Sequence, residues 1–222
     1  MFKKITVLLL LVYRAESLSA QDIKYFFKTL PASYTNELSA KTRDSILQGK
    51  SYYPASNDSE EVRVYKLQEV DLKKSWLRIE MNYESGQRAF ETIELRSFKT
   101  KNGNSIVVFS DFSGVPHQSW QNNLSVLSYT KDKELTKSPS LGLITKVSIK
   151  DFLKPNTPDS IIKKYEGYFS VNYELGLTSN NITLNLYGEL YLEDFYKWLL
   201  GDTIEFLWKD DLFIKQKPIF NE

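Results

Sequence analysis

An alternation of apolar and polar residues in the middle of the chain is the feature that most constrains the fold. From Leu77 to Tyr83, apolar or aromatic residues occupy every second position, and charged or amide side chains fill the positions between them. Successive side chains of a β-strand point to opposite faces. This period of two therefore predicts a strand with one buried and one solvated face.

Turn sequences join this strand to two more. Ser85-Gly86 precedes a predicted strand at 89–98, and Asn102-Gly103 precedes another at 105–112. Asn-Gly is typical of a two-residue type I′ turn, because both central residues of that turn need a positive φ. The apolar run within 105–112 indicates that the third strand is more fully buried. Together the three strands predict an antiparallel meander.

The C-terminal third shows the same pattern. Apolar residues alternate along 169–177 and 182–186 on either side of a turn, which predicts a long hairpin with one buried face. A helix at 192–200 is expected to follow, and then a last pair of strands at 204–208 and 212–215. Between the meander and the hairpin, we expect a loop, a strand, a polar connection and a further strand, at 113–123, 124–130, 131–141 and 143–149.

Short helices complete the predicted fold. Helical spacing at 23–30 ends at Pro31, which lacks a backbone donor. A second helix at 40–48 has Ser39 as its N-cap, and Thr157 is expected to cap a third. The sequence thus predicts an α+β fold, predominantly antiparallel β-sheet built from a meander and hairpins, with a few short helices.

The first twenty residues resemble a secretory signal peptide. Lys3-Lys4 is followed by an apolar run at 5–13 and by small residues that end at Ala20. The charged start favours this interpretation over an apolar N-terminal core strand. Nine residues of helix reach about 14 Å, which is too short to span a hydrocarbon core of ~30 Å. We expect cleavage between Ala20 and Gln21, which would remove residues 1–20, and cleavage after Ser19 is the alternative.

The mature protein would then be residues 21–222. No later run approaches membrane-spanning length, and a chain without cysteine cannot carry a lipid anchor on that residue. The expected product is an exported protein that is periplasmic, secreted or at the cell surface, with no transmembrane segment, and that is not a lipoprotein. It forms either one compact domain or two subdomains divided near 131–141.

The composition excludes several kinds of chemistry. The chain has 222 residues with no cysteine and one histidine, which excludes thiol nucleophiles, zinc–cysteine sites, iron–sulfur clusters and sites with two imidazoles. Its 29 basic and 28 acidic residues argue against nucleic-acid binding, which needs clustered lysine and arginine. Phosphate-binding glycine loops and the GxSxG elbow are absent, and two S-x-x-K triplets are no more than chance predicts. No catalytic residue, metal site or cofactor is therefore predicted.

His117 and Trp120 are the candidate ligand-binding residues. His117 is the single imidazole and lies near Asp111 and Ser119 in the sequence, although a solvated loop histidine is favoured over a general base. Trp120 is flanked by glutamine and asparagine, which suits an exposed aromatic platform for a sugar ring or a peptide. Aromatic residues are also common in strands, and Trp76, Trp198 and Trp208 are expected to fill or border the core.

Glu80, Glu94 and Glu174 fall on strand faces that are expected to be solvated. A glycosidase needs two acids that face each other, one of them with a raised pKa. Ordinary surface charge is the favoured interpretation of these three residues, because nothing in the sequence selects one pair of acids.

Short motifs near both ends of the chain carry a family resemblance. They are Ala-Gln-Asp-Ile-Lys at 20–24, the following Phe26-Phe27 and Leu30-Pro31, the helix around Arg43, and the segment 202–214. Together they resemble a family of small exported proteins from Bacteroidales that is catalogued only as a domain of unknown function. The resemblance implies an envelope protein of a Gram-negative bacterium. It implies no catalytic residues and no particular reaction.

Three functional hypotheses follow from these observations. Predicted strands, many aromatic residues and the lack of catalytic motifs favour a non-catalytic envelope protein that binds a protein, peptide or glycan through sheet edges or loops. The alternative is a carboxylate-dependent hydrolase of polysaccharide or cell wall, which would need two acids about 5–10 Å apart in a deep cleft. The third is a carrier that encloses an apolar ligand within a curved sheet. The sequence leaves the oligomeric state open.

Overall fold

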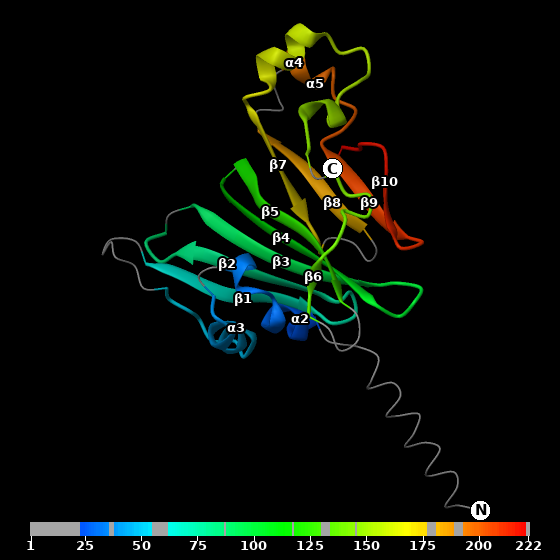
Figure 1. Ribbon diagram of the computed structural model, residues 1–222. Coiled ribbons are helices and arrows are strands. Elements are labelled where there is room, and N and C mark those ends of the chain that lie inside the picture. The colour runs from blue at the N-terminus through cyan, green and yellow to red at the C-terminus, as the bar shows by residue number, and fades with distance from the viewer. Residues whose placement is uncertain are drawn as a thin grey trace, which may run out of the picture.

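The described residues are organised around two antiparallel β-sheets (Figure 1). The computed structural model describes residues 23–35, 38–54, 62–86, 88–116, 118–129, 134–144, 146–176, 181–188 and 193–220. Within these residues, the six-stranded sheet follows chain order: β1 (Arg63–Asp71), β2 (Trp76–Tyr83), β3 (Phe90–Lys99), β4 (Ser105–Val115), β5 (Gln118–Tyr129) and β6 (Thr136–Lys137). The four-stranded sheet has the order β10-β9-β8-β7, made of β7 (Phe169–Glu174), β8 (Asn181–Gly188), β9 (Thr203–Lys209) and β10 (Leu212–Lys215). The predicted α+β fold is confirmed.

Two helices cover one face of the six-stranded sheet. They are α2 (Ile23–Thr29) and α3 (Ala40–Leu47), with the 3₁₀ turn η1 (Ala32–Tyr34) between them (Figure 1). The Ser39 side chain caps α3, as predicted, by accepting a hydrogen bond from the Thr42 backbone N–H at 3.1 Å. Apolar residues of α2 and alternate residues of the strands form the buried cluster beneath: Ile23, Phe26, Phe27, Leu77, Ile79, Leu95, Val107, Phe109 and Leu127.

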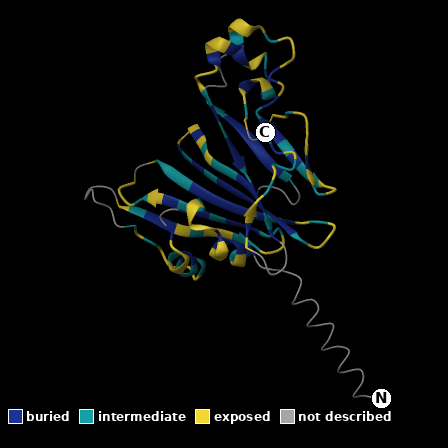
Figure 2. Cartoon of the chain, viewed as in Figure 1, coloured by how far each residue is buried: buried dark blue, intermediate teal, exposed yellow. Residues whose placement is uncertain are grey.

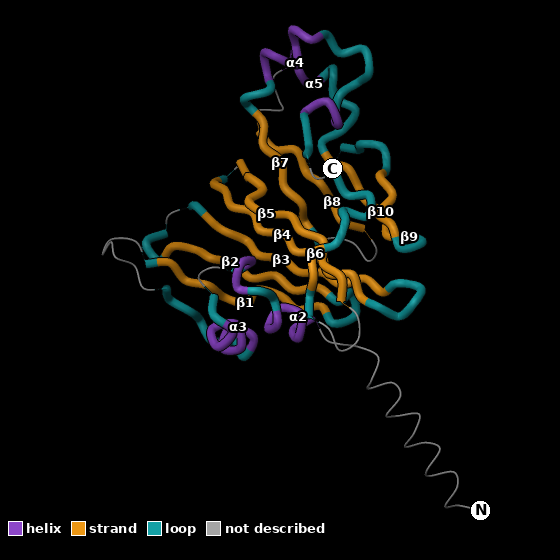
Figure 3. The backbone as a smooth tube through the Cα atoms, viewed as in Figure 1, coloured by secondary structure: helices purple, strands orange, loops and turns teal. Residues whose placement is uncertain are grey.

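The four-stranded sheet rises from the opposite face of the six-stranded sheet. The apolar core between the two sheets contains residues of both, including Phe98, Ile106, Val108, Val126, Tyr173, Ile182, Leu184, Ile204 and Phe206. The 3₁₀ turn η2 (Ile149–Phe152) and the helices α4 (Asp159–Tyr165) and α5 (Glu193–Tyr196) add residues to the same core, and α4 and α5 lie at its far end (Figure 3). Figure 2 shows that buried residues are concentrated in the strands of the two sheets.

Side chains of the six-stranded sheet bind the outer edge of β7. The Tyr173 backbone N–H donates to Gln121 Oε1 at 2.6 Å, and the Tyr173 carbonyl accepts from Ser110 Oγ at 2.8 Å. An edge strand otherwise presents such groups unpaired, ready to bind another chain. Two side chains therefore replace a neighbouring strand at this position.

The next edge residue, Leu175, is held in the same way. Its N–H donates to Glu94 Oε2 at 2.6 Å, and its carbonyl accepts from Arg96 Nη1 at 2.6 Å. Arg96 Nη1 also donates to the Asn181 carbonyl at 2.6 Å, which ties the start of β8 to β3. The two sheets are thus joined by polar contacts along β7 in addition to the apolar core.

The loop predicted at 113–123 is wrong, because β4 and β5 continue through most of it. The two strands pair as far as Val115 and Gln118, with a bulge beside Asp111. Gln121, one of the polar residues that suggested a loop, donates from Nε2 to the carbonyls of Asp111 and Asn123 at 2.9 and 2.8 Å. Polar side chains are compatible with a strand here because neighbouring groups in the sheet bond to them.

The type I′ turn predicted at Asn102-Gly103 is also wrong. Gly103 has a φ of 78° and donates its N–H to the Thr100 carbonyl at 2.9 Å, whereas Asn102 has no positive φ. The connection is therefore a three-residue loop with glycine in the left-handed position. Asp210 and Asp211, with φ of 54° and 63°, instead form a two-residue loop between β9 and β10.

The strand predicted at 143–149 is absent from the described residues. The described residues 143–144 and 146–148 form neither helix nor strand, and η2 begins at Ile149. A capping box fixes this start, since Ser148 Oγ accepts from the Lys150 N–H and Asp151 Oδ2 accepts from the Ser148 N–H. The polar connection predicted at 131–141 contains β6, which pairs with β5.

The later helices differ from those predicted. Thr157 does not cap α4, because its Oγ1 donates to the Lys154 carbonyl at 2.7 Å and the helix begins at Asp159. The helix predicted at 192–200 is reduced to α5. Leu199, beyond α5, instead forms a bridge with Leu153 and joins the core between the sheets.

Both faces of the β7–β8 hairpin are buried, although one solvated face was predicted. Asn172, Thr183 and Asn185 lie on the face opposite the apolar core, and all three are buried. On that same face the Ser170 Oγ accepts from the Ser119 N–H of β5 at 3.1 Å. The alternation identifies the strands correctly, but the six-stranded sheet covers part of their polar face.

No helix in the described part of the chain is both long and apolar enough to cross a bilayer. The predicted leader, with Ala20 and Gln21, lies outside the described residues. The division near 131–141 stays a prediction, and the apolar core includes residues from both sides of it, such as Val126 and Phe206.

Candidate functional site

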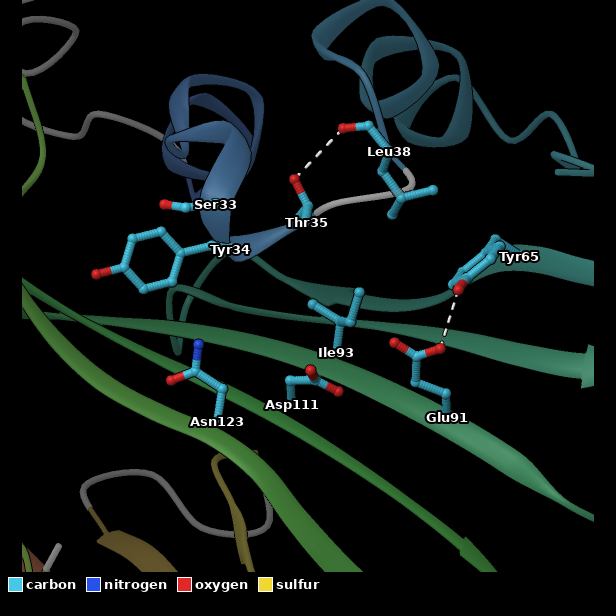
Figure 4. Close-up of a pocket in the computed structure, with 9 residues that line it drawn as sticks. All are labelled: Ser33, Tyr34, Thr35, Leu38, Tyr65, Glu91, Ile93, Asp111 and Asn123. Atoms are coloured by element: carbon cyan, nitrogen blue, oxygen red, sulfur yellow. Dashed lines mark hydrogen bonds between the residues drawn. The ribbon is translucent and has the colours of Figure 1, made fainter.

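A pocket of about 320 Å³ lies between η1 and the six-stranded sheet, on the face that carries the helices (Figure 4). We call it the helix-side pocket. Its lining residues come from η1 and the chain after it, and from β1, β3, β4 and β5: Ser33, Tyr34, Thr35, Leu38, Tyr65, Glu91, Ile93, Asp111 and Asn123.

The strand register places the polar floor of this pocket on one face of the sheet. Ile93 pairs with Asp111, which in turn pairs with Asn123, so the three side chains lie in a row across β3, β4 and β5. Glu91 lies two residues before Ile93 and projects from the same face. Further along the same face, residues such as Leu95 and Phe109 belong to the core under the helices. The pocket lies where this face changes from apolar to polar.

The chain after α2 forms the opposite wall of the pocket. The Tyr34 ring packs edge-on against Phe109, with ring centroids 5.3 Å apart. Arg43 of α3 is buried and donates from Nη1 to the Leu30 carbonyl at 2.8 Å and to Thr35 Oγ1 at 3.1 Å. Since Arg43 bonds on both sides of η1, it fixes the position of Tyr34 over the sheet.

The two carboxyl groups of the pocket have different surroundings. Glu91 Oε2 accepts a hydrogen bond from the Tyr65 hydroxyl at 2.9 Å (Figure 4). Burial raises the pKa of Asp111, and the hydrogen bond from Asn122 Nδ2 to Asp111 Oδ1, at 3.2 Å, opposes that rise. Asp111 is therefore protonated more readily than an ordinary aspartate.

These lining groups favour a ligand rich in hydroxyl groups. Carboxylates accept hydrogen bonds from hydroxyls, amide and phenol groups both accept from and donate to them, and the Tyr34 ring adds an apolar surface. None of the described lining residues is a lysine or an arginine, so the pocket offers no positive side chain to an anion. No group of three or more His, Asp or Glu side chains within the described ranges could hold a metal ion.

Trp120 lies on β5, on the same face of the sheet as the helix-side pocket. It pairs with Ser113, which pairs in turn with Glu91. Trp120 is therefore in the row beside the one that forms the pocket floor, and it is 47% exposed. Trp76 is buried, and Trp198 and Trp208 pack against the same core, as expected for these three residues. His117 lies outside the described residues.

Glu80, Glu94 and Glu174 do not lie on solvated faces as expected. Glu94 is only 1% exposed and lies between the sheets, where Arg78 Nη1 is 3.6 Å from its Oε1. Arg78 Nε donates to Glu80 Oε1 at 2.9 Å, and Glu174 Oε1 accepts from the Tyr187 hydroxyl at 2.7 Å. The structure therefore gathers these acids on the opposite face of the sheet from the helix-side pocket.

The pocket residues Tyr34, Tyr65, Glu91 and Asn123 were not predicted from the sequence. One signal for them is present in the strands. On β3, the inward face reads Leu95, Ile93 and then Glu91, so an apolar face ends in a carboxylate. The aromatic wall has no comparable signal, because it depends on how η1 packs on the sheet.

No family model matches the sequence, and no curated protein matches it either. Among solved structures, a domain of an uncharacterized protein from Porphyromonas gingivalis W83 is similar, with a TM-score of 0.53 and 13% identity. The match covers 87% of this chain and 97% of that chain. At this identity the likeness supports the fold alone. The neighbour comes from Bacteroidales, the order of the family that the sequence motifs resemble.

Proposed function

We propose that this chain is a non-catalytic binding module of the bacterial cell envelope, and that it recognises a glycan in the helix-side pocket. The observation that carries the proposal is the arrangement of one sheet face. Glu91, Asp111 and Asn123 surround a pocket walled by Tyr34, and the exposed Trp120 projects from the same face one row away.

The chemistry of the pocket supports a glycan more than a charged ligand. Sugar hydroxyls donate to carboxylate and amide oxygens and accept from phenols and amides, while the C–H face of a sugar ring packs on an aromatic side chain. Trp120 supplies such an aromatic surface beside the polar groups. A glycan of two or more rings would reach both, with one ring in the pocket and another on Trp120.

The envelope location rests on the leader-like first twenty residues and on the resemblance to exported Bacteroidales proteins. Fractionation of cells that express the full chain tests it. We expect a periplasmic or extracellular product that begins at Gln21, identified by N-terminal sequencing. An uncleaved cytosolic product would contradict this part of the proposal.

Binding of a panel of neutral oligosaccharides, measured by isothermal titration calorimetry, tests the glycan site. Trp120→Ala is expected to weaken binding about tenfold, because it removes an aromatic contact with the ligand. A tenfold change in Kd corresponds to about 1.4 kcal/mol of binding free energy. Tyr168→Ala is the matched control, since Tyr168 is also exposed, at 57%, but precedes β7 in the other sheet. Unchanged affinity in Trp120→Ala, or no binding to any glycan, would overturn the proposal.

Glu91 and Asp111 support a second candidate function, that of a carboxylate-dependent hydrolase. The specific observation is that burial raises the pKa of Asp111, as a general acid requires, while Glu91 shares the same pocket. Release of reducing ends from polysaccharide is the assay. Turnover that is lost in both Glu91→Gln and Asp111→Asn would replace the binding proposal with the enzymatic one.

A further inference from the structure

Four apolar side chains are exposed close together near the far end of the four-stranded sheet. They are Tyr196, the last residue of α5, Leu200, Ile219 and Phe220, with exposed fractions of 48%, 41%, 46% and 39%. The Tyr196 and Phe220 rings stack with their centroids 5.0 Å apart, and the Thr203 N–H donates to the Ile219 carbonyl at 3.0 Å. We call these four residues the far-end apolar patch.

The backbone holds the patch in place on both sides. The Leu200 N–H donates to the Phe152 carbonyl at 2.8 Å, which ties this part of the chain to η2. A Cβ on Gly201 would overlap the Ile219 backbone, so the chain after Leu200 lies directly against the segment that carries Ile219. The patch is therefore one fixed surface made from two segments of the chain.

The core beneath the patch is complete without these four side chains. Phe195 and Leu199, which precede Tyr196 and Leu200, are 0% and 3% exposed and belong to the core between the sheets. Their neighbours in the patch project outward instead. An apolar group of this kind on the outside of a protein is typical of a surface that contacts a partner.

Three exposed lysines border the patch: Lys154, Lys197 and Lys217. Lys154 Nζ donates to the Lys197 carbonyl at 2.6 Å, which places its ammonium group beside the residue that follows Tyr196. Lys197 Nζ is 3.2 Å from Asp194 Oδ1, but the two side chains are 59% and 70% exposed, so solvent weakens this pair. Lys217 is two residues before the patch begins again at 219.

Positive charge exceeds negative charge around the patch. The described acids of the segments 194–202 and 217–220 are Asp194, which pairs with Lys197, and Asp202, which accepts from the Thr203 hydroxyl at 3.1 Å. The partner that suits these segments is therefore apolar on its inside and negatively charged on its surface.

An anionic bilayer fits this description better than a second copy of the chain does. A stable protein interface takes about 20–30 residues from each partner, which is far more than a patch of this size supplies. A peripheral bilayer contact needs only a few side chains. Tyrosine and phenylalanine rings enter the headgroup region, and lysine stems cover apolar surface while their ammonium groups stay beside the lipid phosphates.

We propose that the far-end apolar patch docks the protein on the surface of an anionic lipid bilayer. The four apolar side chains enter the headgroup region, and the three lysines contact phosphate groups. The helix-side pocket lies on the face of the six-stranded sheet that is turned away from the four-stranded sheet, so docking leaves it open (Figure 1). Docking does not require a glycan in that pocket.

Cosedimentation with lipid vesicles tests the proposal on protein purified from cells that express the full chain. We expect binding to phosphatidylcholine vesicles that contain about 30% phosphatidylglycerol, and little binding to pure phosphatidylcholine. Binding should be lost as the NaCl concentration is raised from about 0.05 M to about 0.5 M, because salt screens the lysine–phosphate attraction. No binding to the anionic vesicles, or equal binding to both kinds, would overturn the proposal.

Substitutions at exposed positions locate the contact. The double variant Tyr196→Ser, Phe220→Ser is expected to bind the anionic vesicles about tenfold more weakly, because it removes both rings of the patch. Leu72→Ser is the matched control, since Leu72 is 61% exposed but follows β1 in the other sheet, and it should bind as the wild type does. Lys154→Gln decides the matter should the double variant fail to fold, and it too is expected to weaken binding. Unchanged binding in a folded double variant, or in Lys154→Gln, would overturn the proposal.

Light scattering in the absence of vesicles measures whether the patch joins two copies instead. We expect the wild type and the double variant to have the same mass in solution. A wild-type dimer that becomes a monomer in Tyr196→Ser, Phe220→Ser would overturn the proposal in favour of a second copy.

Discussion

At the scale of single residues, Glu94 shows how the two sheets are joined. Its carboxyl group is 1% exposed and lies close to Arg78, and it accepts the N–H of Leu175 on the neighbouring sheet. Burial raises the pKa of Glu94 to about 7, and the Leu175 N–H and Arg78 limit that rise. Glu94 therefore changes its charge near neutral pH, where most glutamates are fully ionised.

The raised pKa of Glu94 predicts that the stability of the folded protein depends on pH. The variant Glu94→Gln is expected to remove this dependence. The folded state keeps the proton of Glu94 up to about pH 7, whereas the unfolded state loses it near 4.5, so stability falls as the pH rises between these values. Well above pH 7, this one group lowers the free energy of unfolding by about 3 kcal/mol relative to its value well below pH 4.5. In urea unfolding at pH 5 and pH 8, Glu94→Gln is expected to gain stability relative to the wild type at the higher pH.

The matched control for this measurement is Glu69→Gln, which removes a charge from an exposed residue that lines the same cavity as Glu94. Its stability is expected to follow that of the wild type at both pH values. Arg78, Arg96, Glu80, Glu174 and Tyr187 also lie around Glu94 and are unchanged in both variants. Parallel pH curves for Glu94→Gln and the wild type would contradict the assignment to Glu94.

At the scale of elements, the edge of β7 is the feature that departs most from ordinary sheet structure. The N–H and carbonyl groups of Tyr173 and Leu175 are bonded by side chains of β3, β4 and β5, not by a strand. An exposed edge is a template for aggregation, and these side chains cover it. The buried polar residues on this face of the six-stranded sheet thus have a structural role as partners of β7.

Gln121 offers a test of this role, because its amide joins three elements. Oε1 accepts from the Tyr173 N–H, and Nε2 donates to Ser110 Oγ at 3.0 Å. Gln121→Leu is expected to lower the free energy of unfolding by about 1–3 kcal/mol, because it leaves buried groups unpaired. It should also speed hydrogen exchange of the Tyr173 amide.

Gln118→Leu serves as the control, since Gln118 lies on the same strand but is exposed. Its effect on stability is expected to stay within about 0.5 kcal/mol. Equal losses in the two variants would argue that β7 is held by the apolar core alone.

At the scale of the whole molecule, one apolar core connects both sheets and the helices at the far end. Phe98 of β3 is central to it, with ring centroids 5.2 Å from Trp208 and 5.1 Å from Phe213 in the other sheet. Residues before and after the segment 131–141 share this core. Such sharing favours cooperative unfolding of the two sheets.

Phe98→Ala is expected to destabilise the protein by about 3–5 kcal/mol, because it leaves a cavity between the sheets. It should lower the unfolding midpoints of both sheets together. Hydrogen exchange read separately at β2 and β8 measures this. A loss of protection confined to the four-stranded sheet would instead support two subdomains.

Much of the fold could be predicted because it depends on neighbours in the sequence. The period of two from Leu77 to Tyr83 and the alternation after Phe169 identified strands correctly, and Ser39 marked the start of α3. Local signals failed where a distant partner decides the conformation. Gln121 and its polar neighbours suggested a loop, yet they belong to β5 because other strands supply their hydrogen bonds.

The sequence by itself determined the class of fold and the exclusion of thiol and multi-histidine chemistry, since residue types and local periodicity suffice for both. It also singled out Trp120 as an exposed aromatic side chain. Only the tertiary structure decided that Glu91, Asp111 and Tyr34 share a pocket, and that Glu94 is buried. The physical reason is that alternation tells which residues share a face of a strand, while burial and pKa depend on what packs against that face.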